Sequence, residues 1–168
     1  MELFDVYDKH GKRTGKMKVR GETLNEGEYI HGVSLWIANN EGKLLLQKRA
    51  AVKSFAAGKW AVTGGVLDVG ETSKQGCVRE VKEELGLEID AKHIALLHCY
   101  SGNNIIDDIY ITTCDFSLSA VVLREEEVAE VKWASVDEIK QICIEGQFIV
   151  EEITYLEDIE KYLMNRMC

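Results

Sequence analysis

One segment of the sequence, between Gly65 and Leu87, carries its own signals for where a helix starts and stops. Thr72, followed three residues later by Gln75, is a capping box, which is typical of a helix N-terminus. Gly86 is well placed to end the same helix, because glycine readily adopts the left-handed conformation that often follows a last turn. The sequence therefore predicts a helix between Thr72 and Gly86.

This predicted helix has two different faces. Its apolar residues recur at helical spacing and are expected to be buried: Val78, Val81 and Leu85. Its acidic residues recur at i, i+3 and i+4, so they project from another face: Glu80, Glu83 and Glu84. Like charges one turn apart repel each other, at a cost of roughly 0.2–0.5 kcal/mol in helix stability. Acids near the helix C-terminus also oppose the helix dipole. Folding alone does not explain the acidic face.

A bound divalent cation would make the same acidic face favourable. Magnesium prefers oxygen ligands, keeps several waters and commonly shares its coordination shell with substrate phosphates. Carboxylates one helical turn apart can supply half of such a shell. The alternative is a solvated acidic helix face, which the short run EVKEE by itself favours.

A basic stretch precedes this helix in the chain. From Gly42 to Leu67 the sequence has no acidic residue and five basic ones: Lys43, Lys48, Arg49, Lys53 and Lys59. The whole chain has a net charge of -9, so an acid-free stretch beside a carboxylate cluster suggests a site for a small anion. The competing interpretation is a solvated strand end and loop.

The spacing of the whole segment matches a known signature. Gly65, Glu71 and the run REVKEELGL, which begins at Arg79, fill every fixed position of GX5EX7REUXEEXGU, where U is aliphatic. The chain therefore resembles the Nudix (MutT-type) hydrolases, with residues 65–87 as the Nudix box. The flanking sequences GKLLLQKRA, GKW and EVAEVKWASVDEI are also similar to that family. A match at this many spaced positions is far more specific than a lone glycine motif.

The resemblance implies an α/β fold: an α/β/α sandwich with a mixed sheet and a catalytic loop-helix-loop. The sequence predicts one domain over residues 1–168, with residues 1–27 as an N-terminal hairpin extension. Further strands are expected in EYIHGVSLWIAN, KLLLQKRA, Trp60–Thr63 (running into the glycine pair), IALLHCYSG, DIYITTCDFSL and EVKWASV. A capping box at Ser135 and Glu138 predicts one C-terminal helix, and an apolar stripe predicts another over residues 149–164.

The resemblance also implies a reaction and a cofactor. Nudix hydrolases cleave a nucleoside diphosphate linked to another group, by attack of water on phosphorus, with Mg2+ or Mn2+. In this sequence the metal ligands would be Glu80, Glu83 and Glu84, with the backbone of Gly65 near the metal. Glu71 would orient Arg79 and the loop through a salt bridge.

The resemblance leaves two candidates for the general base. Glu84 lies in the box and could act as both ligand and base, whereas Glu127 lies in a loop before the last strand. The expected catalytic group is Glu71, Arg79, Glu83, Glu84 and Glu127. The expected phosphate cradle is Lys48, Arg49 and Lys59, with the glycine pair Gly64 and Gly65.

Two other functions remain open. The N-terminal hairpin and the stretch LLLQKRAAVKSFAAGKW resemble the isopentenyl-diphosphate-isomerase-like branch of the family. True isomerases use a cysteine shortly after the tryptophan, but here Trp60 is followed by Ala-Val-Thr-Gly-Gly, and Cys77 is expected to be a buried thiol. The second alternative is a non-catalytic nucleotide-binding sensor, although such proteins usually lose box glutamates.

Composition limits the cellular compartment and the kinds of partner that are expected. Five cysteines without a CxxC pair predict reduced thiols and a cytoplasmic protein. The net charge argues against nucleic acid as a partner, since binding to its backbone requires an excess of basic groups. The absence of a long apolar run argues against a membrane protein, and the acid-containing N-terminus does not resemble a secretory signal. The expected partner is a small nucleotide diphosphate, with a homodimer through the last helix as a minor possibility.

Overall fold

The computed structural model describes residues 2–150 and 152–166. Its strands are β1 (Leu3–Tyr7), β2 (Arg13–Val19), β3 (Ile30–Ala38), β4 (Leu44–Arg49), β5 (Trp60–Ala61), β6 (Thr63–Val66), β7 (Ala95–Gly102), β8 (Ile105–Thr113) and β9 (Val128–Ala134). Its helices are α1 (Ser73–Leu85), α2 (Val136–Ile144) and α3 (Leu156–Met164). In this described part of the chain, no helix is both long and apolar enough to cross a membrane.

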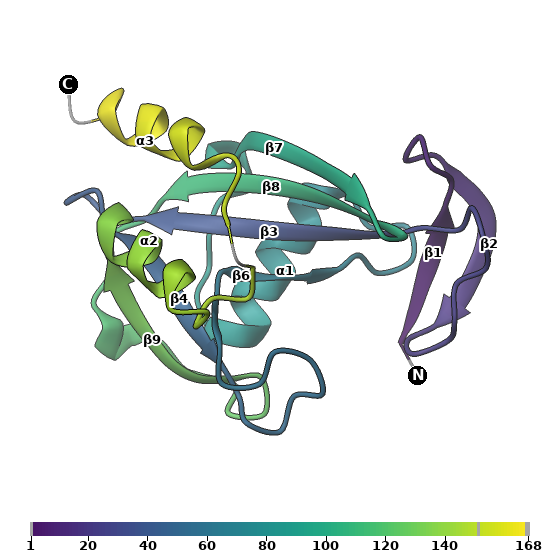
Figure 1. Cartoon of the computed structure of the whole chain (residues 1–168), viewed down its shortest axis with the longest axis horizontal. Coiled ribbons are helices and arrows are strands. Elements are labelled where there is room, and N and C mark those ends of the chain that lie inside the picture. Colours follow the sequence, from purple (N-terminus) through teal and green to yellow (C-terminus); the bar gives the residue numbers. More distant parts are fainter. Residues whose placement is uncertain (1, 151, 167–168) are drawn as a thin grey trace.

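The main sheet is mixed and is organised around β3 (Figure 1). β3 pairs in parallel with β8 along its whole length, and β7 follows β8 as an antiparallel edge strand. On its other side, β3 pairs antiparallel with β6 through Gly32–Leu35 and meets β4 at Ala38. β4 then turns away to pair with β9 and β5. The N-terminal half of β3 therefore lies directly beside the glycine-containing strand β6.

Helices cover both faces of this sheet, as expected for an α/β/α sandwich. One apolar cluster lies between the sheet and α1, and it includes Val33, Leu35, Val81 and Leu85. The other lies on the side of α2 and α3, where Trp36 is fully buried and stacks on Phe148. The sequence-based fold class, including the N-terminal hairpin β1–β2, is confirmed.

The boundaries of α1 follow the local sequence signals. The Thr72 side chain accepts a hydrogen bond from the Gln75 amide, and the Gln75 side chain accepts one from the Thr72 amide, so the capping box is formed. Gly86 ends the helix in the left-handed conformation. Gly76, an unfavourable residue inside a helix, is buried where a Cβ would overlap the side chain of Leu67. Close packing thus explains that glycine.

Three elements differ from the sequence-based expectation. The strand expected in DIYITTCDFSL begins earlier and ends earlier, as β8 from Ile105 to Thr113. The stretch expected as one strand from Trp60 is split into β5 and β6, and the glycine pair lies inside β6. The last helix begins at Leu156, not near residue 149. Backbone pairing accounts for this difference, because Trp60 exchanges hydrogen bonds with Gln147 and Ile149 and so holds residues 147–149 extended. The predicted helical stretch includes residue 151, and the cysteines include Cys168, which both lie outside the described residues.

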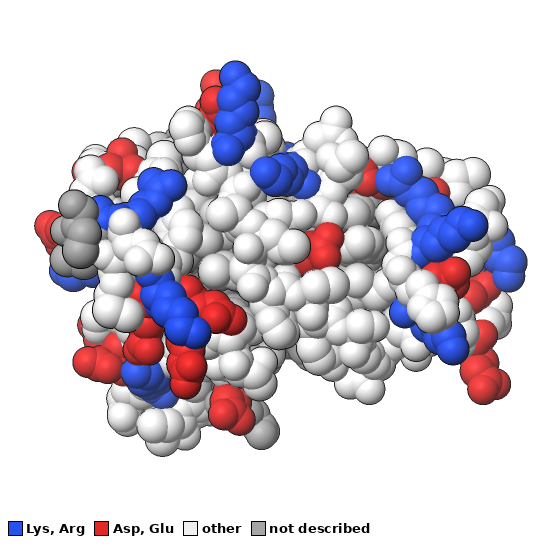
Figure 2. All heavy atoms as spheres, turned by 90° about the horizontal axis from the view of Figure 1, so that it is seen from above, with Lys and Arg blue, Asp and Glu red and all other residues white. Residues whose placement is uncertain are grey.

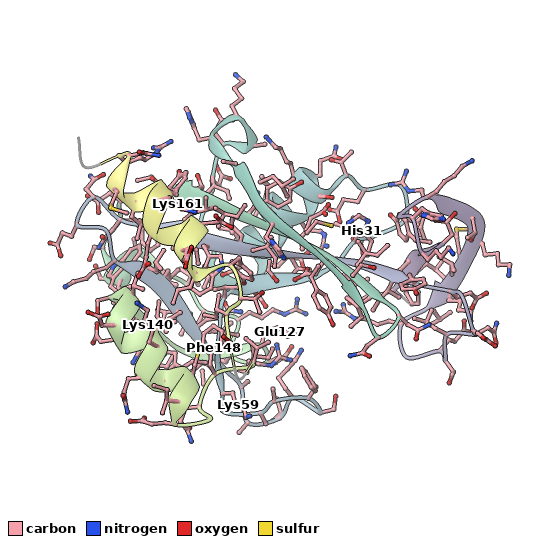
Figure 3. The ribbon with its side chains drawn as sticks, turned by 45° about the horizontal axis from the view of Figure 1, so that its top comes forward. His31, Lys59, Glu127, Lys140, Phe148 and Lys161 are labelled. Atoms are coloured by element: carbon pink, nitrogen blue, oxygen red, sulfur yellow. The ribbon has the colours of Figure 1, made fainter. Side chains whose placement is uncertain are left out.

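The hairpin β1–β2 is docked against the main sheet and against the loop before α1. Tyr7 and Tyr29 exchange backbone hydrogen bonds. The Tyr7 ring packs edge-on against His31, which is labelled in Figure 3, with ring centroids 5.0 Å apart. The Asp5 carboxylate accepts a hydrogen bond from the Gly70 amide, with a donor–acceptor distance of 2.9 Å. The Arg13 guanidinium donates to the Glu71 carbonyl at 2.6 Å. These contacts fix the hairpin to the segment that leads into the helix.

Charged side chains concentrate at the two ends of the face seen in Figure 2, over the hairpin and over the α2–α3 end, and its middle is largely uncharged. Opposite charges on the hairpin pair with one another. Lys18 and Lys16 both contact the buried carboxylate of Glu28, at 2.5 and 3.1 Å. Arg20 contacts Glu2 at 2.6 Å. The exposed strand β2 is therefore held by ion pairs as well as by its hydrogen bonds to β1.

A pair of glycine substitutions tests the way α1 ends. Gly86 and Gly146 have nearly the same left-handed φ, 66° and 67°, but a Cβ at position 86 would crowd Val122, and one at position 146 would meet nothing. We expect Gly146→Ala to lower the free energy of unfolding by about 1 kcal/mol, from backbone strain alone. Gly86→Ala should cost roughly 1–3 kcal/mol more, because crowding is added. Urea unfolding of both variants measures this, and equal losses would contradict it.

Candidate active site

Arg79 is the centre of an ion-pair network at the N-terminal side of the acidic face. Its Nε and Nη2 atoms donate to the two carboxylate oxygens of Glu71, both at 3.0 Å. Nη1 donates to Glu80 at 2.8 Å and to Glu83 at 3.4 Å. Nη2 also donates to the carbonyl of Val66 in β6, at 3.0 Å. One guanidinium therefore ties together the loop, the helix and the strand.

Glu80 lies against the glycine pair of β6. Its side chain is buried, and a Cβ on Gly65 would overlap the Glu80 carboxylate. Burial raises the pKa of Glu80, and the charge of Arg79 only partly offsets this effect. Only glycine at position 65 leaves room for this carboxylate, so the first residue of the motif has a steric role next to the acids.

Glu84 is the most strongly perturbed acid of the site. Its residue is only 6% exposed, and burial raises its pKa to about 7. The Gln47 side chain, from β4, donates a hydrogen bond to the Glu84 carboxylate at 2.9 Å, and Thr63 donates to the oxygen of the same Gln47 amide at 3.3 Å. This buried network orients Glu84 and lowers its pKa less than burial raises it. A carboxyl group with such a pKa can hold or release a proton near neutral pH.

The chemistry of these residues fits a hard divalent cation. Two carboxylates are buried with raised pKa values, so each would gain from a nearby positive charge, and carboxylate oxygens are the ligands that Mg2+ and Mn2+ prefer. Glu83, by contrast, is 45% exposed and turned toward Arg79. Among the described residues, no three His, Cys, Asp or Glu side chains converge on a common ion position. In this structure the carboxylates instead accept hydrogen bonds from Arg79 and Gln47.

Glu127, the second candidate for the base, lies on a neighbouring loop (Figure 3). It forms an ion pair with Lys53, which comes from the loop between β4 and β5. The two loops are also joined through their backbones, because the Ala50 amide donates to the Glu127 carbonyl at 2.9 Å. Glu127 is therefore partly neutralised by a lysine, whereas Glu84 receives only neutral donors.

Two cations of the predicted phosphate cradle, Lys48 and Arg49, contact other residues in this structure. Gln47 faces α1, and the next residue, Lys48, projects from the opposite face, where its ammonium group lies 5.7 Å from the centre of the Trp60 ring. Arg49 is held by the loop after β4, with its Nε donating to the Phe55 carbonyl at 3.1 Å. Lys59 belongs to the same loop and is labelled in Figure 3. The grouping of these three cations around a phosphate stays a prediction.

Gly64 lies beside the acids, because its amide donates a hydrogen bond to Glu84. A Cβ at this position would overlap the backbone of Val33 in β3, so glycine allows β6 and β3 to approach closely. The Gly64 amide also lowers the pKa of Glu84 slightly, as a hydrogen-bond donor does. This strand therefore brings the glycine pair next to both Glu80 and Glu84.

Sequence reasoning missed Gln47, the one side chain that directly orients Glu84. Gln47 is 2% exposed, although it is polar. The signal was its place in LLLQKR, where a polar residue follows three leucines in a predicted buried strand. A buried amide needs partners, so such a residue points to a nearby polar site.

Comparisons with known proteins agree with this geometry. Residues 28–150 match the family model described as the NUDIX domain. An uncharacterised Nudix hydrolase of Listeria monocytogenes is 36% identical over 151 residues, which cover 89% of this chain and 89% of that protein. Isopentenyl-diphosphate Delta-isomerase 2 of Photorhabdus laumondii is 28% identical over 148 residues, covering 84% and 81%. DR0079 of Deinococcus radiodurans has a similar fold, with a TM-score of 0.76, 19% identity and coverage of 95% and 98%.

The raised pKa of Glu84 predicts a pH-dependent change in stability. Its pKa is about 7 when folded, against about 4.3 in an unfolded chain, so its protonated form favours folding. That contribution is present below pH 4 and is lost as the pH rises through 7. We therefore compare the free energies of unfolding of Glu84→Gln and of the wild type, with metal removed by EDTA. The difference in favour of the variant should increase by roughly 1–3 kcal/mol between pH 5 and pH 8. Urea unfolding at both pH values measures it, and a constant difference between the two proteins would refute it.

Proposed function

The chain belongs to the Nudix hydrolase family, and we propose that it hydrolyses the diphosphate linkage of a nucleoside di- or triphosphate or of a nucleoside diphosphate derivative. As a member of this family it is a hydrolase that acts on pyrophosphate bonds. The observation that carries the finer proposal is the pair of buried carboxylates, Glu80 and Glu84, beside the glycine pair of β6. Buried acids with raised pKa values are poorly explained by folding alone and suit a site that receives positive charge.

We propose Glu80, Glu83 and Glu84 as ligands of Mg2+ or Mn2+, with the backbone of Gly65 nearby. When bound, the metal would neutralise charge on the phosphate oxygens and on the leaving group. Nudix hydrolases generally use divalent ions of this kind. The part of Arg79 is to hold Glu80 and Glu83 in place, and Glu71 fixes the orientation of Arg79 through two hydrogen bonds.

Side chains of this protein are proposed to accept the proton of the attacking water and to bind the phosphates of the substrate. A water molecule attacks phosphorus, the phosphorus–oxygen bond of the anhydride breaks, and the leaving phosphate carries away the bonding electrons. The proton of the water passes to Glu84, whose pKa near 7 matches a base that works at neutral pH. Gln47 keeps the Glu84 carboxylate oriented throughout. Lys48, Arg49 and Lys59 are proposed to contact the outer phosphates as substrate binds.

The isomerase remains the competing enzyme, because one relative carries that name. As the resemblance implies, isomerisation would require a cysteine that donates or accepts a proton. Cys77 is 1% exposed, and burial raises its pKa to about 12. A thiol of this kind is a poor proton donor and a poor base near neutral pH. The site therefore favours hydrolysis over isomerisation.

The sensor is the competing function without catalysis. Its sequence signature would be the loss of box glutamates, but all of them are present here. Ligand binding alone would also not require a buried Glu84 carboxylate that accepts a hydrogen bond from Gln47. We further propose that the protein acts in the cytoplasm, in keeping with its unpaired cysteines among the described residues.

A substrate panel tests the reaction. Wild-type protein with Mg2+ or Mn2+ is incubated with nucleoside di- and triphosphates, nucleoside diphosphate sugars and isopentenyl diphosphate in water enriched in oxygen-18. We expect hydrolysis of at least one nucleotide, with the heavy oxygen found in a phosphate product. The Glu83→Gln/Glu84→Gln double variant should lose roughly 100-fold or more in kcat. Glu88→Gln, an exposed change just after the helix, is the matched control. Formation of the dimethylallyl isomer without nucleotide hydrolysis would overturn the proposal.

Single variants separate the two candidates for the base. Removal of a general base typically costs 100- to 10,000-fold in kcat. We expect a loss in this range for Glu84→Gln at saturating Mg2+, and less than about tenfold for Glu127→Gln, whose charge is already paired with Lys53. The pH dependence of kcat/KM for the wild type and each variant provides the second readout. Near-normal turnover of Glu84→Gln would show that Glu84 is not the base and would favour Glu127.

A further inference from the structure

A cavity of about 250 Å³ lies between the N-terminal hairpin and the strand that leads into the Nudix box. Its apolar lining is Leu3, Phe4, Leu24, Ile30, Val66 and Leu67. Charged residues of both signs complete the lining, among them Arg20 and Glu2. Binding pockets commonly combine apolar walls with a few polar groups in this way.

The cavity and the acidic site share one wall. Val66 lines the cavity, and its carbonyl accepts the hydrogen bond from Arg79. The residue before it, Gly65, lies against the Glu80 carboxylate. Asp68, also in the lining, has its carboxylate 3.4 Å from Arg79 Nε. A ligand that spans the two sites would therefore pass along β6.

In the described part of the chain, Arg20 is the one basic residue in the lining of this cavity, which it shares with Val66 and Asp68, and both of these contact Arg79. The negative charges of Glu80 and Glu127 both raise the pKa of Arg20, after its hydrogen bond to Glu2, and Arg20 in turn lowers the pKa of Glu80. Its side chain remains 56% exposed. Its partner Glu2 is itself exposed, so an incoming anion can replace it at low cost.

The hairpin that carries Arg20 is held in a defined position. Asp5 binds the Gly70 amide, and Arg13 binds the Glu71 carbonyl, both in the loop that carries the Nudix box. Yet the match to the family model begins only at residue 28. The cavity is therefore made partly by the family domain and partly by a hairpin outside that match.

We propose that this cavity binds the group attached to the diphosphate of the substrate, and that Arg20 binds a phosphate oxygen at its entrance. This proposal rests on the proposed function and extends it to the choice of substrate. A guanidinium is suited to two parallel hydrogen bonds with a phosphate, which an ammonium group cannot form. Arg20 is thus a specificity-determining residue supplied by the hairpin.

The lining limits the chemistry of the bound group. A volume of about 250 Å³ lies below the usual range for a whole drug-sized ligand, so it suits one ring or a group of similar size. The walls are mostly aliphatic, and Glu2, Glu22 and Asp68 would repel a second anion. The favoured substrates therefore carry an uncharged, flat or apolar group next to the diphosphate.

Kinetics of hairpin variants test the role of Arg20. With the panel substrate of highest kcat/KM, Arg20→Gln should raise KM roughly 10- to 100-fold, the range expected for one lost charge-assisted hydrogen bond, and change kcat less than about threefold. Arg20→Lys should recover only part of this loss. Lys12→Gln, which removes a charge from the exposed hairpin turn, is the matched control and should behave as wild type.

A cavity-filling variant separates the two halves of the proposal. Leu24 is half-buried in the cavity lining, so Leu24→Trp should raise KM at least tenfold. Inorganic pyrophosphate, used as a competitive inhibitor, has no attached group. Its inhibition constant should rise with Arg20→Gln and stay unchanged with Leu24→Trp. Thermal unfolding verifies that each variant is folded, and Arg20→Gln, at an exposed position, keeps the test valid if Leu24→Trp does not fold.

The outcomes distinguish the two levels of the proposal. If the wild type hydrolyses no member of the panel, the proposed function fails, and this inference fails with it. If the wild type is active but Arg20→Gln matches Lys12→Gln, the proposed function stands and the role of Arg20 is wrong. If Leu24→Trp folds and leaves KM unchanged, the attached group binds elsewhere.

Discussion

The rest of the site depends on the guanidinium of Arg79. Its donors reach the loop through Glu71, the helix through Glu80 and Glu83, and strand β6 through the Val66 carbonyl. No other residue type could do this, because only arginine presents five donors in a rigid planar fork. The cluster of negative charge that looks unfavourable in the sequence is therefore folded around one positive charge. Local repulsion within the helix is offset by contacts that span three elements.

A second polar network fixes the start of the same helix to the sheet. Asp108 of β8 accepts hydrogen bonds from Ser73, the first residue of α1, at 2.6 Å and pairs with His31 of β3 at 2.9 Å. The hydrogen bond with His31 lowers the pKa of Asp108 to about 2, so this acid stays charged at physiological pH. The hairpin packs on the other side of His31 through Tyr7. Helix, sheet and hairpin thus meet at one junction.

The proposed role of Glu84 as a base would set stability against activity. Glu84 is buried with a pKa near 7, so the folded chain bears a cost whenever this group is ionised. A glutamine would fit the same space and keep the hydrogen bond with Gln47, but it could not accept a proton. Proteins commonly retain such destabilising groups where function requires them. The buried carboxylate is therefore better explained by chemistry than by folding.

The sequence by itself determined the family, the fold class, and where α1 starts and ends. The ends of α1 depend on residues three or four positions apart, and the family and fold class follow from the resemblance that the box carries within residues 65–87, so these signals are local and can be read directly. Tertiary structure decided which side chains meet the acids: Gln47 from β4 beside Glu84, and Lys53 from the loop after β4 beside Glu127. It also decided the start of the last helix, because the backbone of residues 147–149 pairs with Trp60. Such contacts join segments that are distant in sequence, and their partners are fixed only when the sheet and its layers come together.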